Sequence, residues 1–143
     1  MKLYLLHPIS VHFPITLLIT ALFFEGVHRI IHKEWLGKAS TALLYLGTLG
    51  ALTAAGLGLL AEDTVPHVPD AWEFLYNHKI LGLVTAGLFL VLSAWKLFWG
   101  KFWPASMTPR VFLGVWILAI VILMVTAYFG GELVFQFGVG YHR

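Results

Sequence analysis

The sequence contains no cysteine among its 143 residues, and only 11% of those residues are charged. Without cysteine, the chain can form no disulfide bond, thiolate metal site, iron–sulfur cluster or covalent c-type haem attachment. A soluble domain usually carries about 25% charged residues. The shortage of charge, with a hydrophobic content of 59%, excludes an ordinary soluble enzyme and indicates that lipid is the main solvent. A net charge of +2 is too small to indicate a nucleic-acid partner.

Long apolar stretches account for the high hydrophobic content. We predict membrane spans at about 8–29, 39–61, 80–99 and 111–131, each near the ~20 residues that cross a hydrocarbon core. The second and fourth stretches contain no charged residue, whereas Pro14 and Glu25 interrupt the first. Short connections favour antiparallel neighbours, so the predicted fold is all-α: one integral membrane domain, an up-down four-helix bundle.

The distribution of basic residues predicts the orientation of this bundle. Lipid-facing proteins keep lysine and arginine in cytoplasmic loops, and both termini of a four-span protein lie on one side. The loops after spans one and three, with the adjoining span ends, carry six of the nine basic residues: Arg29, Lys33, Lys38, Lys96, Lys101 and Arg110. We therefore expect a multi-pass protein of the bacterial inner membrane with both termini in the periplasm.

Small residues recur along the second span at intervals of four. One row is Gly47, Ala51 and Ala55, and the other is Gly50, Ala54 and Gly58. Such rows let helix backbones approach closely in a membrane. We interpret them as packing surfaces, with room for a cofactor ring as the less favoured alternative.

Histidines and acids gather at the predicted periplasmic end. A b-type haem needs two imidazoles from different helices, and spans one and three are diagonal partners in an up-down bundle. The leading prediction is therefore an electron carrier whose haem iron is bound by His12 and His78, with His7 and Glu132 close to the ring. Roles for His67 and His142, at the same end, stay open.

Two alternatives remain open at this point. A divalent-metal binding or transport protein would need three or four convergent ligands. A small subunit of a larger membrane complex would need no cofactor. No Ser/His/Asp or Cys/His grouping is present, so we expect no catalytic activity of its own. The candidate ligands for the metal alternative are His7, His12, His78, Glu62, Asp63 and Glu132.

A second polar group lies at the other end of span one. Glu25, His28 and His32 fall at i, i+3 and i+7 on one helical face, and Glu-x-x-His is a pair that di-iron bundles use. That chemistry needs carboxylates from other helices, and Glu34 is the only other acid at this end. We therefore favour an i,i+4 ion pair between Glu25 and Arg29.

The motif H-P-I-S-V-H-F-P at residues 7–14, read with G-G-E-L-V at 130–134 and G-V-G at 138–140, resembles the DUF2231 family of bacterial membrane proteins. The resemblance covers nearly the whole chain. It implies four spans, a histidine opening the third span, as His78 does, and an association with electron-transfer proteins. Many members carry a histidine where this chain has Phe137. The implied partners are other membrane redox subunits or a second copy of the chain, and a quinone is compatible.

Overall fold

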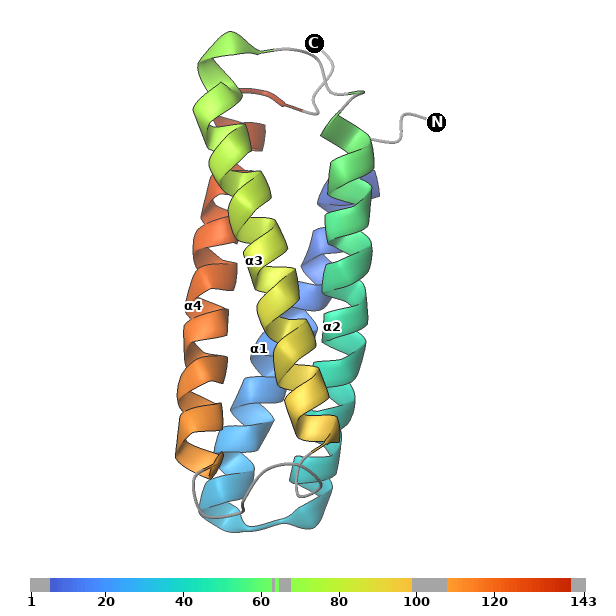
Figure 1. Ribbon diagram of the computed structural model, residues 1–143, viewed down its shortest axis with the longest axis vertical. Coiled ribbons are helices and arrows are strands. Elements are labelled where there is room, and N and C mark those ends of the chain that lie inside the picture. Colours follow the sequence, from blue (N-terminus) through green and yellow to red (C-terminus); the bar gives the residue numbers. More distant parts are fainter. Residues whose placement is uncertain (1–5, 63, 65–67, 99–107, 140–143) are drawn as a thin grey trace.

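The computed structural model describes residues 6–62, 64, 68–98 and 108–139. Within them lie four long helices and one short 3-10 turn (Figure 1). In chain order these elements are α1 (Leu6–Ile31), α2 (Glu34–Glu62), η2 (Pro69–Ala71), α3 (Trp72–Leu97) and α4 (Thr108–Phe135).

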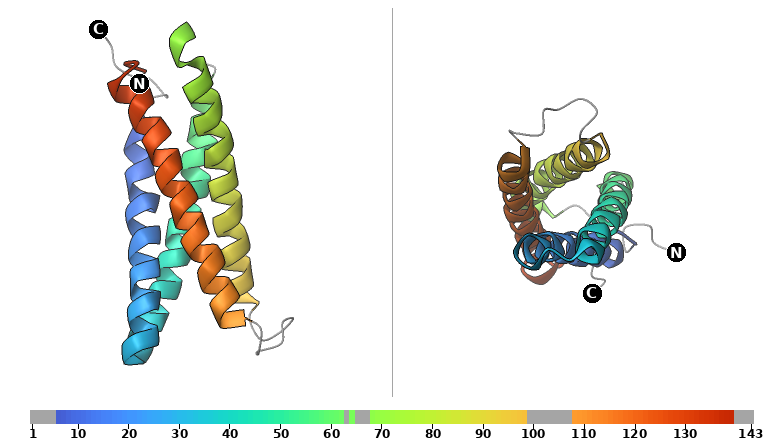
Figure 2. Two further views of the ribbon diagram at one scale, coloured as in Figure 1. Left: turned by 90° about the vertical axis from the view of Figure 1, so that its left-hand side faces the viewer. Right: turned by 90° about the horizontal axis from the view of Figure 1, so that it is seen from below.

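The four helices run alternately up and down along one axis. α1 begins and α4 ends at the same end of the bundle, at the top of Figure 1. Seen along the axis, the helices follow one another around a square in chain order, so α1 lies diagonally opposite α3 (Figure 2). This arrangement confirms the predicted all-α up-down four-helix bundle.

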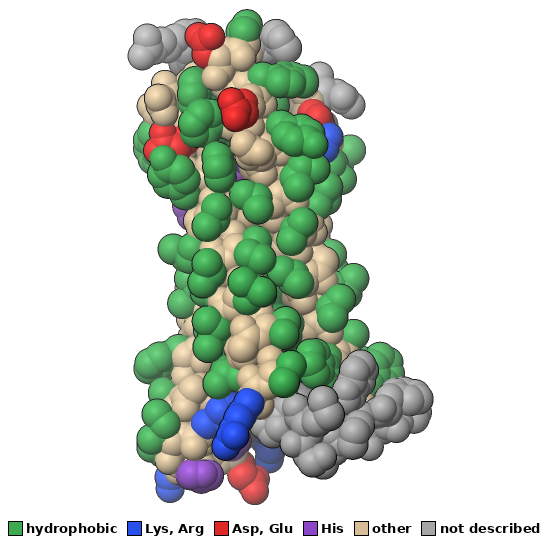
Figure 3. Space-filling view, turned by 60° about the vertical axis from the view of Figure 1, so that its left-hand side comes forward, with side chains coloured by type: hydrophobic (Ala, Val, Ile, Leu, Met, Phe, Trp, Pro, Cys, Tyr) green, Lys and Arg blue, Asp and Glu red, His purple; other side chains and the backbone are tan. Residues whose placement is uncertain are grey.

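All four long helices are long and apolar enough to cross a membrane. The helices extend past the predicted spans at both ends, with one exception. The predicted third span ends at residue 99, whereas α3 ends at Leu97, and residue 99 lies outside the described residues. Large apolar side chains cover the outer surface along its middle, as Figure 3 shows. Phe23, Leu60, Leu90 and Leu118 are examples, each at least half exposed. The chain is therefore a multi-pass membrane protein whose apolar exterior faces lipid.

Small residues of α2 form the contact with α1, as predicted. A Cβ at Gly47 would lie 2.7 Å from the side chain of Leu18, which is fully buried. A Cβ at Gly50 would lie 3.3 Å from the ring of Pro14, a buried residue inside α1. These two glycines thus let the backbones of α1 and α2 approach closely.

The two halves of the bundle repeat one pattern, which the sequence analysis missed. Phe89 of α3 stands 71 positions after Leu18 of α1, and Trp116 of α4 stands 72 positions after Leu44 of α2. All four side chains are fully buried and belong to one core cluster. The hairpin of α3 and α4 therefore buries residues at positions equivalent to those that the hairpin of α1 and α2 buries. The two hairpins pack around a common centre.

Candidate functional site

Two histidines from diagonal helices meet at the end of the bundle where α1 begins and α3 begins. His7 lies in the first turn of α1, and His78 lies in the second turn of α3. Their ring centres are 5.8 Å apart, and the ring planes are inclined by 72°. Both side chains are partly buried. The bundle thus holds two imidazoles side by side between its halves.

Each imidazole is fixed by a hydrogen bond to the backbone of the neighbouring helix. Nδ1 of His7 donates to the carbonyl oxygen of Ala54 at 2.8 Å, and Nδ1 of His78 donates to that of Thr126 at 3.0 Å. A carbonyl can only accept, so in the neutral ring the proton lies on Nδ1. Nε2 of both rings then carries a lone pair, the state in which histidine binds a metal ion.

A glycine makes room for each ring. A Cβ at Gly58 of α2 would lie 3.0 Å from Cε1 of His7. A Cβ at Gly130 of α4 would lie 2.8 Å from Cε1 of His78. Since real Cβ contacts are essentially never shorter than 3.0 Å, the His78 ring as placed requires glycine at Gly130. The glycines of α2 and α4 thus admit the imidazoles themselves.

The two histidine environments are copies of each other. In both, the accepting carbonyl precedes the glycine by four residues: Ala54 before Gly58, and Thr126 before Gly130. His78 follows His7 by 71 positions, and Gly130 follows Gly58 by 72, the same offsets that relate the buried core positions. The pair therefore lies where the repeated hairpins meet. A search of the sequence for a repeat at this offset could have found it.

The structure places His12 away from this pair. The sequence predicts His12 as the partner of His78, but His12 is exposed on the outer surface of α1. Residues five apart on a helix are separated by roughly 140°, so α1 cannot turn both histidines toward the centre. Contact with Ala54 and Gly58 of α2 decides that His7 faces inward.

The other predicted ligands lie elsewhere or outside the described part. Both carboxylate oxygens of Glu62 accept from Nζ of Lys79, at 2.8 and 2.6 Å, so Glu62 is already paired. Glu132 lies in α4 two residues after Gly130. Within the described residues, no group of three or more His, Cys, Asp or Glu side chains is placed to hold a metal ion. Asp63, a predicted ligand, lies outside the described residues, as do His67 and His142, whose roles the sequence leaves open.

The predicted ion pair between Glu25 and Arg29 at the opposite end is confirmed, and Lys96 joins it. Glu25 is 3% exposed and accepts from Nε and Nη2 of Arg29 at 3.0 and 2.9 Å. Its second carboxylate oxygen accepts from Nζ of Lys96 at 3.2 Å, which joins α1 to the diagonal helix α3. Lys96 follows Glu25 by 71 positions, the offset that relates His78 to His7.

These features define a class: a four-span helical membrane protein with one diagonal side-chain contact between its halves near each end. The chain belongs to the family described as "Predicted membrane protein (DUF2231)", which matches residues 5–143. No curated protein and no solved structure matches the chain.

Proposed function

We propose that this protein is an electron carrier of the bacterial inner membrane that binds a b-type haem between His7 and His78. The observation that supports the proposal is the duplicated site. Two neutral imidazoles, each held through Nδ1 with Nε2 left to bind a metal, come from helices on opposite sides of the bundle. Relative to the sequence prediction, the proposal replaces His12 with His7.

The donor set fits haem better than a free divalent ion. His7 and His78 would supply the two imidazoles that a low-spin b-type haem takes from a protein. Two imidazoles that share one metal ion through Nε2 have ring centres about 5–6.5 Å apart, depending on the angle at the metal, because metal–nitrogen bonds are about 2 Å long. The observed separation is 5.8 Å. A zinc-like site needs further ligands, and the described residues offer no group of three.

The protein's own groups would orient the ligands and keep water out. The carbonyl oxygens of Ala54 and Thr126 fix the rotation of each imidazole and raise the basicity of its Nε2. The hydroxyl of Thr126 is 3.1 Å from that of Thr85 and donates to the carbonyl of Ile122 at 2.8 Å, which ties this part of α4 to α3. When bound, the haem supplies one-electron redox chemistry, and the chain needs no proton donor or nucleophile for that role.

Charge segregation supports the orientation that goes with this role. On the face that Figure 3 shows, most acidic side chains lie at the histidine end and most basic ones at the opposite end. The loop joining α1 to α2 carries Lys33, with Arg29 and Lys38 on either side. By the positive-inside rule this end is cytoplasmic. The haem would then lie near the periplasmic surface, within reach of redox subunits or a quinone.

The test is an absorption spectrum of the protein purified in mild detergent, oxidised and then reduced with dithionite, with metal analysis of the same sample. The proposal predicts a Soret band and sharp, split α and β bands on reduction. A colourless sample that also takes up no added haem would contradict it. Bound zinc or copper in such a sample would favour the divalent-metal alternative, and no metal would favour a cofactor-free subunit.

A further inference from the structure

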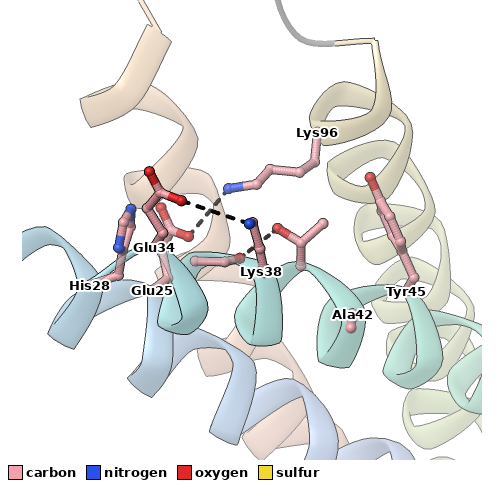
Figure 4. A pocket seen from close by; sticks show the side chains of 9 residues that line it. Glu25, His28, Glu34, Lys38, Ala42, Tyr45 and Lys96 are labelled. Atoms are coloured by element: carbon pink, nitrogen blue, oxygen red, sulfur yellow. Dashed lines mark hydrogen bonds and ion pairs between the residues drawn. The ribbon is translucent and has the colours of Figure 1, made fainter. Parts of the chain in front are cut away.

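A shallow, open groove with charged side chains at its rim lies at the basic end of the bundle, at the opposite end from the histidine pair. It has a volume of about 610 Å³ and lies between α1, α2 and the end of α3. Figure 4 shows Lys96 reaching across it from α3 toward Glu25. Its charged and hydroxyl-bearing lining residues are Glu25, Glu34, Lys38, Thr41, Tyr45 and Lys96.

The groove passes from the head-group region of the membrane into its apolar part. Helix α2 has 29 residues and is therefore about 44 Å long, whereas the hydrocarbon core is about 30 Å thick. The first one or two turns of α2, with Glu34 and Lys38, therefore project among lipid head groups. Ala42 and Tyr45 lie two to three turns further along the same helix and line the inner part of the groove.

The outer part of the groove carries one exposed and loosely paired charge of each sign, Glu34 and Lys38, beside the ion pair of Lys96 with Glu25. The side chains of Glu34 and Lys38 are 88% and 80% exposed, and their charged atoms are 3.7 Å apart. Lys96 donates to Glu25 at 3.2 Å and has further N–H groups, because an ammonium carries three. A carboxylate and two ammonium groups are thus available to a ligand.

His28 adds a hydrogen-bond acceptor. Its Nδ1 donates to the carbonyl of Lys33 at 2.8 Å, so Nε2 of the neutral ring carries the lone pair. The ring lies against Gly37, where a Cβ would be 3.1 Å from Nε2. His28 and Glu34 can both accept from a primary ammonium group, and Lys38 and Lys96 can both donate to a phosphate.

We propose that this groove binds the head group of a zwitterionic phospholipid with a primary ammonium, as in phosphatidylethanolamine. The phosphate lies between Lys38 and Lys96, the ammonium faces Glu34 and His28, and an acyl chain follows Ala42 and Tyr45 inward. A choline head group cannot donate N–H bonds to Glu34 or His28, so the groove selects against it. The inference is independent of the haem, which lies at the other end of the bundle.

Native mass spectrometry of the detergent-purified protein tests this site. The protein is mixed with equal amounts of phosphatidylethanolamine, phosphatidylcholine and phosphatidylglycerol that carry identical acyl chains. We expect one phosphatidylethanolamine to be retained in about tenfold excess over phosphatidylcholine, which corresponds to about 1.4 kcal/mol. The variant Glu34→Gln should abolish that preference, because it removes the carboxylate that faces the ammonium. Lys38→Gln should lower the retention of both lipids, because it removes a charge that faces the phosphate they share.

Lys33→Gln is the matched control, since Lys33 is an exposed lysine next to the groove but not part of its lining. It should keep the preference of the unmodified protein. Equal retention of the three lipids, an unchanged preference in Glu34→Gln, or unchanged retention in Lys38→Gln would overturn the proposal. Displacement of the lipid by equimolar phosphoethanolamine would also overturn it, because a soluble phosphate ester would then be the ligand.

Discussion

At the scale of single residues, the position of the His78 imidazole depends on the absence of a Cβ atom at Gly130. Gly130 lies under the imidazole of His78, whereas the adjacent Gly131 has open space around the position of a Cβ. The two glycines follow each other in the same helix, so the same substitution at each separates the effect on the imidazole from the general effect of alanine in a helix.

Gly130→Ala should displace the His78 ring and weaken haem binding about tenfold, which corresponds to about 1.4 kcal/mol and is within the usual cost of overpacking. The measurement is a haem titration followed by the Soret band. Gly131→Ala is the control and should bind haem as the unmodified protein does. Equal affinities in the two variants would show that the close contact at Gly130 does not position the ligand.

The second residue-scale prediction concerns Glu25. Glu25→Gln removes the carboxylate that two cations share and leaves Lys96, with 24% of its side chain exposed, without its partner inside the bundle. Breaking a buried ion pair from one side usually costs about 3–5 kcal/mol, and partial exposure of Lys96 favours the lower end. We expect the free energy of unfolding, measured with denaturant in detergent without added lipid, to fall by about 3 kcal/mol.

Glu34→Gln is the control for this measurement, because its pair with Lys38 is highly exposed. Exposed pairs contribute about 0–1 kcal/mol, so this variant should unfold almost as the unmodified protein does. If Glu25→Gln were as stable as Glu34→Gln, the ion pair would not be what joins α1 to α3 at this end.

At this scale the sequence predicts part of the site. His78, the Glu25–Arg29 pair and the gathering of histidines at one end follow from helical spacing and charge. The choice of His7 over His12 does not, because it depends on which carbonyl and which glycine of α2 face α1. Those contacts are long-range, and Ala54 and Gly58 carry no chemical signal of their own in the sequence.

At the scale of helices, small residues and hydroxyl groups make the interhelical contacts. Small residues join α1 to α2, where Gly47 lies against Leu18. Hydroxyl groups join α2 to α3, where Thr48 and Ser93 are 2.8 Å apart. Apolar packing in a membrane gains little from excluding water, so close approach and interhelical hydrogen bonds determine which helices associate.

Gly47→Ala tests the contact of α1 with α2. The added methyl group would lie 2.7 Å from the fully buried side chain of Leu18, so one of the two must shift. We expect a loss of about 1–3 kcal/mol in unfolding free energy. Gly56→Ala, on the same helix with nothing within 4 Å, should be neutral or stabilising by up to about 1 kcal/mol. The contact would be judged unimportant if both variants unfolded alike.

The helices themselves are largely predictable from the sequence, because uncharged apolar stretches of this length have few alternatives in a membrane. Their ends are not, since polar residues such as Glu34 and Glu73 continue the helix into the head-group region. The repetition of the core pattern in α1 with α2 and α3 with α4 is visible in the sequence only as a weak recurrence at offsets of 71 and 72 positions.

At the scale of the whole molecule, the distribution of charged residues predicts which side of the membrane each end of the bundle faces, and hence the side on which His7 and His78 lie. The absence of cysteine makes this simple to measure, because any introduced thiol is unique. Thr64 follows α2 at the histidine end, and Lys33 lies between α1 and α2 at the basic end. Both are exposed.

In intact spheroplasts, a membrane-impermeant maleimide should label Thr64→Cys and leave Lys33→Cys unlabelled. Disruption of the membrane should then make Lys33→Cys reactive. The reason is the positive-inside rule, which keeps the basic loop in the cytoplasm. The reverse pattern would place the histidine pair at the cytoplasmic surface and overturn the proposed orientation.

In the proposed haem site, each of the two repeated hairpins contributes one equivalent histidine ligand. The most direct measurement is the ratio of haem to protein in His7→Ala, His78→Ala and His12→Ala, purified side by side with the unmodified chain. We predict that His7→Ala and His78→Ala each lose the low-spin spectrum and most of their haem, while His12→Ala retains both. Full haem retention in His7→Ala, or loss in His12→Ala, would contradict the assignment of His7 and His78 as the haem ligands.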